Sequence, residues 1–513
     1  MADLERRLVA SEAARVEVEA RLAVAEEARA RLERMLKQMR HERFGAKSEK
    51  RDPDQRHLPF EDVDVAAGML AGASDAAEKA LGAGKKAPQP PRRNKGHLPK
   101  HLPRIERVIE PESRLCPCGC GEMAKVGEDR SERLDVIPAQ FRVLVTIRPK
   151  YVCRTCAGAS HAQAPAPEWR VPRGLPTEAL VAHSMVAKFG DYLPFYRQAD
   201  IYRRQGIDLD RTMLAEWSGR AALLLSPVID AMVAELRRSD RLQMDETIVP
   251  VLAPGTGAVR KDWLWVVLRD QRGWGGGDPP IVVFHHSRSR GGAVAQEILK
   301  GFAGGTLLVD GHSGYDVLAD PKRTAKPWTI AWCWTHWRRR FVKFSQDTPS
   351  PLCEEMIARI AELYAIEKEI RGRDPGTRTA VRQRLSKPIV EALRPWLQGC
   401  LQDLSSANDL AKHIRYGLKR WDGLTRFLED GRLEMDTNAV ENAIRPIPLT
   451  RKNALFAGSI DGAKTWARIA SLIGTCRLNG INPEAYIAAT LRRILDQHMQ
   501  RDITELMPWN FRG

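Results

Sequence analysis

Three observations predict a multidomain α/β protein. At 513 residues the chain is too long for one hydrophobic core, and its length predicts roughly 3–4 domains. Short apolar runs typical of β-strands are confined to residues 242–334, and helical periodicity dominates before and after them. Cysteines gather in two clusters, at residues 116–120 and 153–156, as in a small module that a metal stabilises.

The composition of the chain indicates which binding partners and which cellular compartment to expect. Hydrophobic residues make up 43% of the chain and charged residues 28%, which is ordinary, but the net charge of +16 is not. Excess positive charge attracts phosphate polymers, although a basic enzyme that binds none would share it. No apolar run approaches the ~20 residues of a membrane-spanning helix, and the charged N-terminus lacks the apolar region of a signal peptide. We therefore expect a cytoplasmic protein with no membrane partner, whose nine cysteines bind metal or are buried.

Residues 1–45 carry a heptad repeat that predicts a dimerising coiled coil, with a lone amphipathic helix as the alternative. Its a and d positions hold Leu4, Leu8, Val18, Leu22, Ala25, Leu32, Leu36 and Met39. Residues 46–104 follow as a basic, proline-rich linker, because this composition cannot bury enough apolar surface to fold. Its basic segment at residues 85–95 is explained equally well by contact with a DNA backbone and by solvation.

Residues 105–168 predict a zinc ribbon that binds DNA, with free buried thiols as the alternative. Cys153 and Cys156 have C-x-x-C spacing, and a second pair of thiolates would complete a tetrahedral zinc site. The first half is crowded, because Cys116, Cys118 and Cys120 are separated by single residues, so one of the three is expected to be surplus. Between the two halves, residues 142–148 alternate like a strand.

Residues 171–238 are expected to form helices. One helix should begin at Pro176, and a second apolar run extends over residues 213–236. Breaks near residues 192–194 and at Gly206 suit a helix-turn-helix unit, and plain helical packing explains them equally well.

The sheet is predicted within residues 240–341. Strands are expected at residues 242–252, 262–268, 281–285, 306–309 and 328–334, with a glycine-rich turn at 273–277 and a helical crossover at 291–302. Three strands, a helix and two further strands form the order of a ribonuclease-H-like catalytic core, in which the first and fourth strands are neighbours. Residues 342–434 predict a helical insertion that interrupts this core. Residues 435–462 would then complete the core, and residues 463–513 would form C-terminal helices.

Three acidic residues carry the predicted chemistry. Asp245 lies in the first strand, Asp310 ends the fourth, and Glu441 lies in a short helix before Pro446. Two strand carboxylates and one helix carboxylate can converge on a pair of divalent cations, which would activate an attacking oxygen and stabilise a leaving oxygen in phosphoryl transfer.

Each acid also has a simpler explanation. Asp245 fits an exposed strand edge, with Glu246 as the more informative neighbour, and Asp310 fits a turn. Glu441 has the spacing of a capping-box partner and of a surface ion pair. The joint position of the three acids in the predicted core favours the catalytic interpretation. The acids most easily confused with them are Asp316 and Asp436.

The motifs around these acids resemble those of the DDE transposases of bacterial insertion sequences, and more narrowly those of the insertion-sequence-sixty-six family. The acidic motifs are MDET at residues 244–247, VDG at 309–311 and NAVENAIRP at 438–446. Further similar stretches are RFGAKSEK at 43–50, RPKYVC at 148–153, CWTH at 333–336 and LNGINPEAY at 478–486. The crowded first cysteine cluster departs from the plain C-x-x-C expected there, which leaves its ligand assignment open.

This resemblance implies a catalytic and metal-binding role for Asp245, Asp310 and Glu441. They would bind two Mg²⁺ ions for end nicking and for attack of the freed 3′-hydroxyl on target DNA. Cys333 and His336 match a C-x-x-H motif that would shape the site, with a buried cysteine and a capping histidine as the alternative. The resemblance also implies one structural Zn²⁺.

The resemblance also implies partners. These are the terminal inverted repeats, target DNA, small accessory proteins of the same element and a second copy of the chain, in a nucleoid-associated protein. Two other functions stay open, a nuclease that cuts without joining and a DNA-binding repressor on an inactive scaffold. The residues expected to contact DNA are Arg338, Arg339, Arg340, Arg445, Arg451 and Lys452.

Overall fold

The computed structural model describes residues 141–145, 147, 149–152, 161–163, 176–253, 256, 258–322, 326–496 and 498–512. The chain divides into two compact units, Ala77–Glu168 and the combination of Met1–Ala76 with Trp169–Gly513. Within the first unit, strands β1 (Lys150–Val152) and β2 (His161–Gln163) form an antiparallel pair. The predicted coiled coil, the basic linker and all five candidate zinc-binding cysteines lie outside the described residues.

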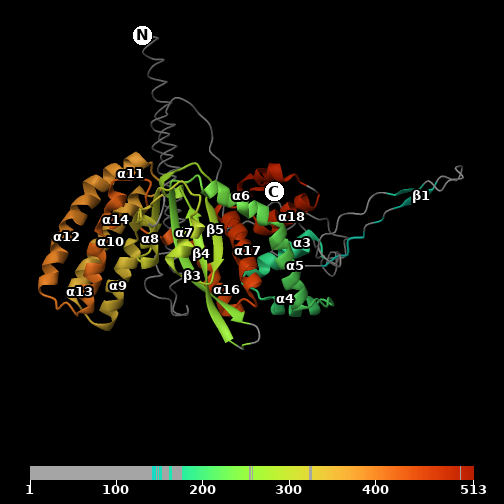
Figure 1. The fold of residues 1–513 in the computed structure, drawn as a ribbon, viewed down its shortest axis with the longest axis horizontal. Coiled ribbons are helices and arrows are strands. Elements are labelled where there is room, and N and C mark those ends of the chain that lie inside the picture. Colours follow the sequence, from blue (N-terminus) through green and yellow to red (C-terminus); the bar gives the residue numbers. More distant parts are fainter. Residues whose placement is uncertain are drawn as a thin grey trace, which may run out of the picture. The chain divides into compact units, whose positions relative to one another are not determined.

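The second unit is built on a five-stranded mixed sheet. Its strands are β3 (Arg241–Ala253), β4 (Ala258–Arg269), β5 (Ile281–Ser287), β6 (Thr306–Val309) and β7 (Thr329–Trp332). The spatial order is β5-β4-β3-β6-β7, with antiparallel pairing from β3 to β5 and parallel pairing from β3 to β7 (Figure 1). Helix α7 (Gly292–Ile298) connects β5 to β6. The predicted adjacency of the first and fourth strands is therefore confirmed.

The C-terminal helix α17 (Ile460–Leu478) covers the edge strand β5. The hydroxyl oxygen of Ser471 accepts a hydrogen bond from the Phe284 N–H at 2.9 Å, and that of Thr475 accepts from the Val282 N–H at 3.1 Å. A Cβ added at Gly474 would lie 2.6 Å from Val282 Cγ1, so glycine permits this close approach. Side chains of α17 thus satisfy backbone groups that an edge strand would otherwise leave unpaired.

Between residues 176 and 238 the described chain forms four helices, in agreement with the helical prediction for residues 171–238. They are α3 (Glu178–Phe189), α4 (Phe195–Arg203), α5 (Arg211–Leu224) and α6 (Ser226–Leu236). Thr177 and Asp210 cap α3 and α5 with side-chain oxygens. The helix α18 (Pro483–Leu495) packs against α3. Among the described residues, no helix combines the length and apolarity needed to cross a bilayer.

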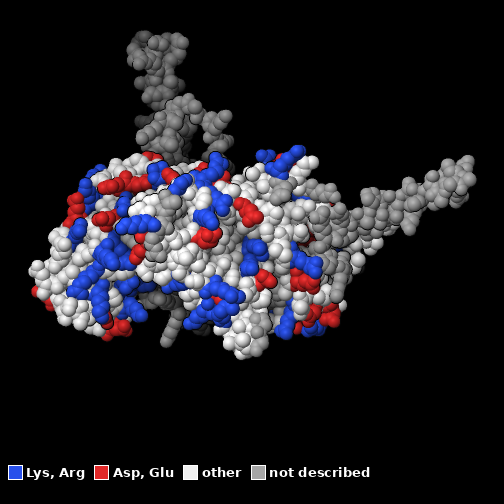
Figure 2. Space-filling view, viewed as in Figure 1, with Lys and Arg blue, Asp and Glu red and all other residues white. Residues whose placement is uncertain are grey.

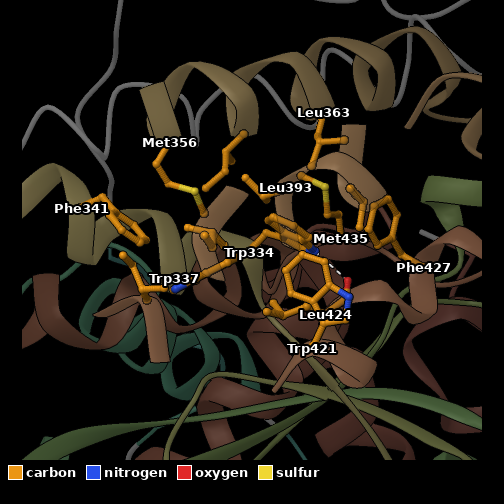
Figure 3. Close-up of a cluster of buried hydrophobic side chains, with 14 of the residues drawn as sticks. Trp334, Trp337, Phe341, Met356, Leu363, Leu393, Trp421, Leu424, Phe427 and Met435 are labelled. Carbon is orange, nitrogen blue, oxygen red and sulfur yellow. Dashed lines mark hydrogen bonds between the residues drawn. The ribbon is translucent and has the colours of Figure 1, made fainter. Parts of the chain in front are cut away.

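A hydrophobic core lies between α9 (Trp334–Asp347) and the helices that follow it (Figure 3). The helices that contribute to this core are α10 (Pro351–Ile370), α12 (Lys387–Gln402), α13 (Asp409–Lys419) and α14 (Trp421–Thr425). The short helix α11 (Pro375–Val381) lies between α10 and α12 in the chain. The buried indole of Trp334 donates a hydrogen bond to the Leu424 carbonyl at 2.7 Å, and that of Trp337 donates to the His413 carbonyl at 2.9 Å. Residues 342–434 are therefore helical, as predicted.

Two predicted strands were partly wrong. The described residues between 142 and 149 form no strand, and β1 begins only at Lys150, because β2 offers three pairing partners. The fifth strand ends at Trp332, where its partner Val309 ends β6. Without a further partner the chain turns, and Trp334 becomes the first residue of α9.

Buried ion pairs connect the insertion to the segment before the acidic helix. Arg382 is fully buried and donates two hydrogen bonds to Glu367, at 2.8 and 2.7 Å. Arg378 is also fully buried and donates to both carboxylate oxygens of Glu434, at 2.8 and 3.0 Å. Because buried charges are costly without partners, these pairs constrain the path of the chain from the insertion toward residue 441.

We predict that Glu367→Ala strongly destabilises the insertion. Removal of this carboxylate leaves buried Arg382 unpaired, which should cost about 3–5 kcal/mol of unfolding free energy. Urea unfolding followed by tryptophan fluorescence measures the loss. As a control, Glu355→Ala breaks the pair with Arg359 (2.7 Å) on the outer face of α10. The control should cost no more than about 0.5 kcal/mol; equal losses in the two variants would contradict the role of Glu367.

Candidate active site

Strands β3 and β6 bring Asp245 and Asp310 together. The two strands run parallel and pair Gln243 with Leu308, so the residues two positions farther along are Asp245 and Asp310. Asp245 remains within β3, and Asp310 follows the last residue of β6. Carboxylate oxygens of Asp245, Glu246 and Asp310 lie within 4.8 Å of one another. The acidic ends of these two strands therefore share one site.

Glu441 reaches this site from helix α15 (Asn438–Ile444). The side-chain oxygen of Gln243 accepts a hydrogen bond from the Val440 N–H at 3.3 Å, which attaches the helix to β3. The Glu441 carboxylate lies 3.3 Å from Arg339 Nη2 and 3.5 Å from His336 Nδ1. These two neighbours, Arg339 and His336, come from α9 rather than from the helix that carries Glu441.

The three predicted acids interact electrostatically. Burial, followed by the negative charges of Glu246, Asp310 and Glu441, raises the pKa of Asp245 well above its usual range. His336 acts in the opposite direction. Crowded carboxylates of this kind repel one another until a cation neutralises them, so the donor set fits divalent metal ions that prefer oxygen ligands.

Glu246 is the acid that the sequence marked only as a neighbour. Its side chain is buried, and it accepts hydrogen bonds from Arg290 Nε at 2.5 Å and from the Tyr315 hydroxyl. Arg290 Nη2 also lies 3.8 Å from Asp310 Oδ2. Because β3 is paired with β4 on one side and with β6 on the other, the explanation of Asp245 as an exposed edge residue is wrong. No local sequence signal indicated Arg290 or Tyr315, because both reach Glu246 only through the fold.

Cys333 and His336 lie beside Glu441, as the C-x-x-H motif suggested. Cys333 is the residue before α9, and its buried sulfur accepts a hydrogen bond from the Thr437 N–H at 3.3 Å. The Thr437 hydroxyl lies 3.2 Å from this sulfur and 3.3 Å from Glu441 Oε1. Burial raises the pKa of the Cys333 thiol. The contacts link the end of β7 to the start of α15 and so help to orient Glu441.

Arginines surround the carboxylates. Arg339 contacts Glu441, while the guanidinium carbon of Arg340 lies 3.8 Å from the ring centre of Tyr416. Arg420 lies 4.2 Å from the same ring centre and donates a hydrogen bond to the Gly311 carbonyl at 3.2 Å. Sequence reasoning missed Tyr416 and Arg420, which are four residues apart on or next to α13 and carry no local motif.

Gly311 lets the insertion approach Asp310. A Cβ added at Gly311 would lie 1.1 Å from the Tyr416 hydroxyl oxygen. The residue after the acid must therefore lack a side chain for Tyr416 to contact this turn. The backbone N–H of His312 also donates to Asp310 Oδ1 at 2.8 Å, which orients the carboxylate.

The other expected DNA-binding residues lie on or near α15 and α16 (Pro446–Ala454). Arg451 donates a hydrogen bond to the Ile248 carbonyl at 2.6 Å and so attaches α16 to β3. Lys452 is exposed and Arg445, which follows α15, is half-buried. The remaining expected residue, Arg338, lies on α9. On the face shown in Figure 2, Lys and Arg side chains gather over the insertion and near the protruding end of the β3–β4 hairpin.

The two competing acids lie apart from the trio. Asp316 is exposed at the start of α8 (Asp316–Ala319). Asp436 is buried, and its burial raises its pKa to about 6. It borders a cavity of about 230 Å³ beneath α15 whose lining includes none of Asp245, Asp310 and Glu441. This cavity is therefore separate from the predicted carboxylate cluster.

Comparison with known proteins identifies the family of this chain. The sequence model described as "Transposase IS66 family" covers residues 173–465, which include all three acids. The chain belongs to the IS66 transposase family. The resemblance to the insertion-sequence-sixty-six family is thereby confirmed. DNA is a partner of this transposase, and its enzyme class is that of the transposases.

Three further family models match the transposase outside this region. The zinc-finger binding domain of the IS66 transposases matches residues 113–157, which contain the five cysteines. The IS66 C-terminal element matches residues 471–509, and a model described as "Transposase C of IS166 homeodomain" matches residues 31–107. A zinc-binding module within residues 105–168 is therefore supported by the family.

Relatives of similar length occur in Sinorhizobium fredii (strain NBRC 101917 / NGR234). The uncharacterized protein y4qI is 40% identical over 517 residues, which cover 99% of this chain and 94% of that protein. The uncharacterized protein y4jD is 42% identical over 82% of this chain and 83% of its own, and y4hP is 35% identical over 94% and 88%.

We predict that Asp245→Asn stabilises the metal-free transposase at neutral and alkaline pH. The pKa of Asp245 is raised in the folded state, so its stabilising contribution is complete only below the unfolded pKa of about 3.9 and is lost as pH rises through the folded value. Asparagine does not ionise, so the variant avoids this loss of folding stability. At pH 8 the melting temperature should rise by about 2–4 °C, which corresponds to about 1 kcal/mol in a domain of 150–250 residues.

Thermal unfolding in the presence of a chelator measures this effect between pH 4 and pH 8. The gain should shrink toward pH 4, where the wild-type carboxyl is increasingly protonated. Asp316→Asn, at an exposed acid outside the cluster, should leave the melting temperature unchanged. A lower melting temperature of Asp245→Asn at pH 8 would show that a neighbouring group stabilises the ionised form.

Proposed function

We propose that this protein is a Mg²⁺-dependent DNA transposase that nicks the ends of its element and joins the freed 3′-hydroxyl to target DNA. The observation that carries the proposal is the pairing of Asp245 on β3 with Asp310 after β6, whose carboxylate oxygens lie within 4.8 Å of each other, together with the negative charge of Glu441 on α15, which acts on Asp245. The strand order β5-β4-β3-β6-β7, with β6 and β7 parallel to β3, supports a ribonuclease-H-like core.

We assign Asp245, Asp310 and Glu441 as the ligands of two Mg²⁺ ions. When bound, the ions would activate the attacking oxygen and stabilise the leaving oxygen of an in-line displacement. Glu246 is assigned a different role, because Arg290 and Tyr315 already bind its two carboxylate oxygens. It holds Arg290 next to Asp310 and fixes the wall of the site.

The arginines around the cluster would bind the DNA backbone. The Arg339 guanidinium lies 3.3 Å from Glu441, at the border of the proposed metal site, where it would also donate to a phosphate oxygen of bound DNA. Arg338 and Arg340 extend the same helix, and Arg420 is assigned to this set because it lies beside Gly311. Arginine suits this task because its planar donors match phosphate oxygens.

The remaining parts of the chain would deliver DNA to the site. We assign binding of the terminal inverted repeats to the zinc-binding module and the adjoining helices, and dimerisation to the N-terminal heptads. Arg445, Arg451 and Lys452 would contact flanking DNA from α15 and α16. Accessory proteins of the element and a nucleoid-associated location in the cytoplasm complete the proposal.

Strand-transfer assays test the chemistry. Purified protein, a labelled element end, a target plasmid and Mg²⁺ should yield joined product. Asp245→Asn, Asp310→Asn and Glu441→Gln should each lower cleavage and joining by more than about 10³-fold, because each removes a ligand of ions that contribute several kcal/mol to the transition state. Binding of the end, measured by fluorescence anisotropy, should persist.

Asp316→Asn serves as the matched control and should retain full activity. Cleavage without joining would indicate a nuclease instead of a transposase. Binding without either product in the wild-type protein would indicate a repressor. Full activity of Asp245→Asn would remove that residue from the ligand set.

Zinc analysis tests the cysteine module. We expect one Zn²⁺ per chain by atomic absorption, and loss of this zinc when Cys153 and Cys156 are both replaced by serine. Single replacements of Cys116, Cys118 and Cys120 should identify the surplus thiol, since only its variant keeps full zinc content. A zinc content near zero in the wild-type protein would remove the metal from the proposal.

A further inference from the structure

A strained turn follows α16. Leu455 has φ 61° and ψ −56°, and Tyr192 is the other described non-glycine residue with a positive φ. The Phe456 N–H donates a hydrogen bond to the Ala454 carbonyl at 2.7 Å, which closes a three-residue turn around Leu455. Turns of this hand are rare because an L side chain crowds its own backbone. Such strain persists only where surrounding contacts impose it.

The contacts that impose it lie on both sides of the turn. Before it, the side-chain amide of Asn453 donates to the Tyr192 carbonyl at 3.1 Å. After it, the Ala457 N–H donates to the Pro250 carbonyl at 2.8 Å, and the Ala457 carbonyl accepts from the Leu252 N–H at 2.9 Å. The turn is thus held between the loop that follows α3 and strand β3.

The side chains that this rigid turn presents are apolar and face solvent. Leu455 is 65% exposed and Phe456 is 38% exposed. We call these two residues the apolar wedge. Exposed large apolar side chains in a strained, doubly anchored turn do not contribute to the core, so their placement needs another explanation.

Cationic residues flank the apolar wedge. Lys452 is exposed in the last turn of α16. On the other side of β3, Lys261 is exposed opposite Pro250, and Arg260 lies opposite Val251, where it also pairs with Asp262. An apolar tip with a cationic border matches the chemistry of side chains that enter a DNA base step while neighbouring cations contact phosphates.

We propose that Leu455 and Phe456 insert into a base step of duplex DNA bound to the active site, and so kink that duplex. The proposal rests on the transposase function proposed above. Val251, which bridges to Ala457, is six residues from Asp245 along β3. At about 3.3 Å per residue this separation is roughly 20 Å, or about six base pairs of DNA at 3.4 Å each. The wedged step therefore lies about six base pairs from the reacting phosphate.

A duplex suits the apolar wedge better than a protein partner does. Two exposed side chains supply far less than the roughly 800 Å² per partner that stable protein interfaces bury. Intercalating wedges need only one or two apolar side chains, because their energy comes from stacking on bases and from the contacts that the bent DNA then makes.

Fluorescence of 2-aminopurine tests the proposal. Full-length protein in chelator is mixed with duplexes that carry the probe at single steps about four to eight base pairs from the reacting phosphate. One arm uses the element end and the other uses target DNA. Fluorescence should rise at one or two adjacent steps in one arm, which identifies the duplex that is wedged. Phe456→Ala should abolish this rise and weaken binding of that duplex by roughly tenfold.

Leu455→Gly separates DNA contact from folding. Glycine adopts the positive φ without strain, so this variant should melt no lower than the wild type and still lose the fluorescence signal. Val259→Ala removes another exposed apolar side chain (46% exposed), at the start of β4, and should change neither the fluorescence signal nor the affinity for DNA. A mismatch at the wedged step should restore binding by Phe456→Ala, because the step is then already unstacked.

The outcomes distinguish the two proposals. Binding without a fluorescence rise at any step overturns the apolar wedge and leaves the transposase intact. A rise in fluorescence without joined product in Mg²⁺ overturns the transposase and leaves the wedge. A fall in self-association of Phe456→Ala, with an unchanged DNA signal, would show that these side chains bind a second protein chain and would overturn the wedge.

Discussion

The parallel pairing of β3 with β6 is the constraint on which the rest of this structure depends. Gln243 lies opposite Leu308 in that pairing, and the same residue attaches α15 through the Val440 N–H. One register therefore positions Asp245, Asp310 and Glu441 together. A slip of one residue would turn the side chains of β3 to the opposite face and separate the carboxylates. The long continuation of β3 to Ala253 carries the same register out to the turn at Leu455.

Negative charge is concentrated around Asp245, Asp310 and Glu441, and neighbouring arginines partly neutralise it. Arg339 lies 3.3 Å from Glu441, and Arg290 binds Glu246 and approaches Asp310. The balance is incomplete at Asp245, whose raised pKa reflects burial and three neighbouring carboxylates. This arrangement is the basis of the proposed cation site, because cations would relieve repulsion that the protein alone does not remove. The same arginines are suitably charged for the phosphates of an approaching DNA strand.

The helical insertion contacts the chain next to the carboxylate cluster. Tyr416 and Arg420 reach the turn after Asp310, which only glycine at position 311 permits. Arg378 binds Glu434 a few residues before α15. The insertion thus contacts the chain next to the second acid and shortly before the third. Helix α9 connects the two regions, because Trp334 and Trp337 belong to the core of the insertion while His336 and Arg339 contact Glu441.

The sequence by itself determined most strand and helix types, because these depend on local periodicity, and short motifs such as MDET and VDG led to the prediction of the three acids. Only the tertiary structure decided the partners of those acids. Arg290, Tyr315, Tyr416 and Arg420 lie far from Asp245 in the chain, and no periodicity records which side chains meet across the fold. The ends of strands also depend on the tertiary structure, since Trp332 ends β7 where Val309 ends its partner β6. The conformation of Leu455 likewise depends on contacts of its neighbours Asn453 and Ala457 with Tyr192 and β3.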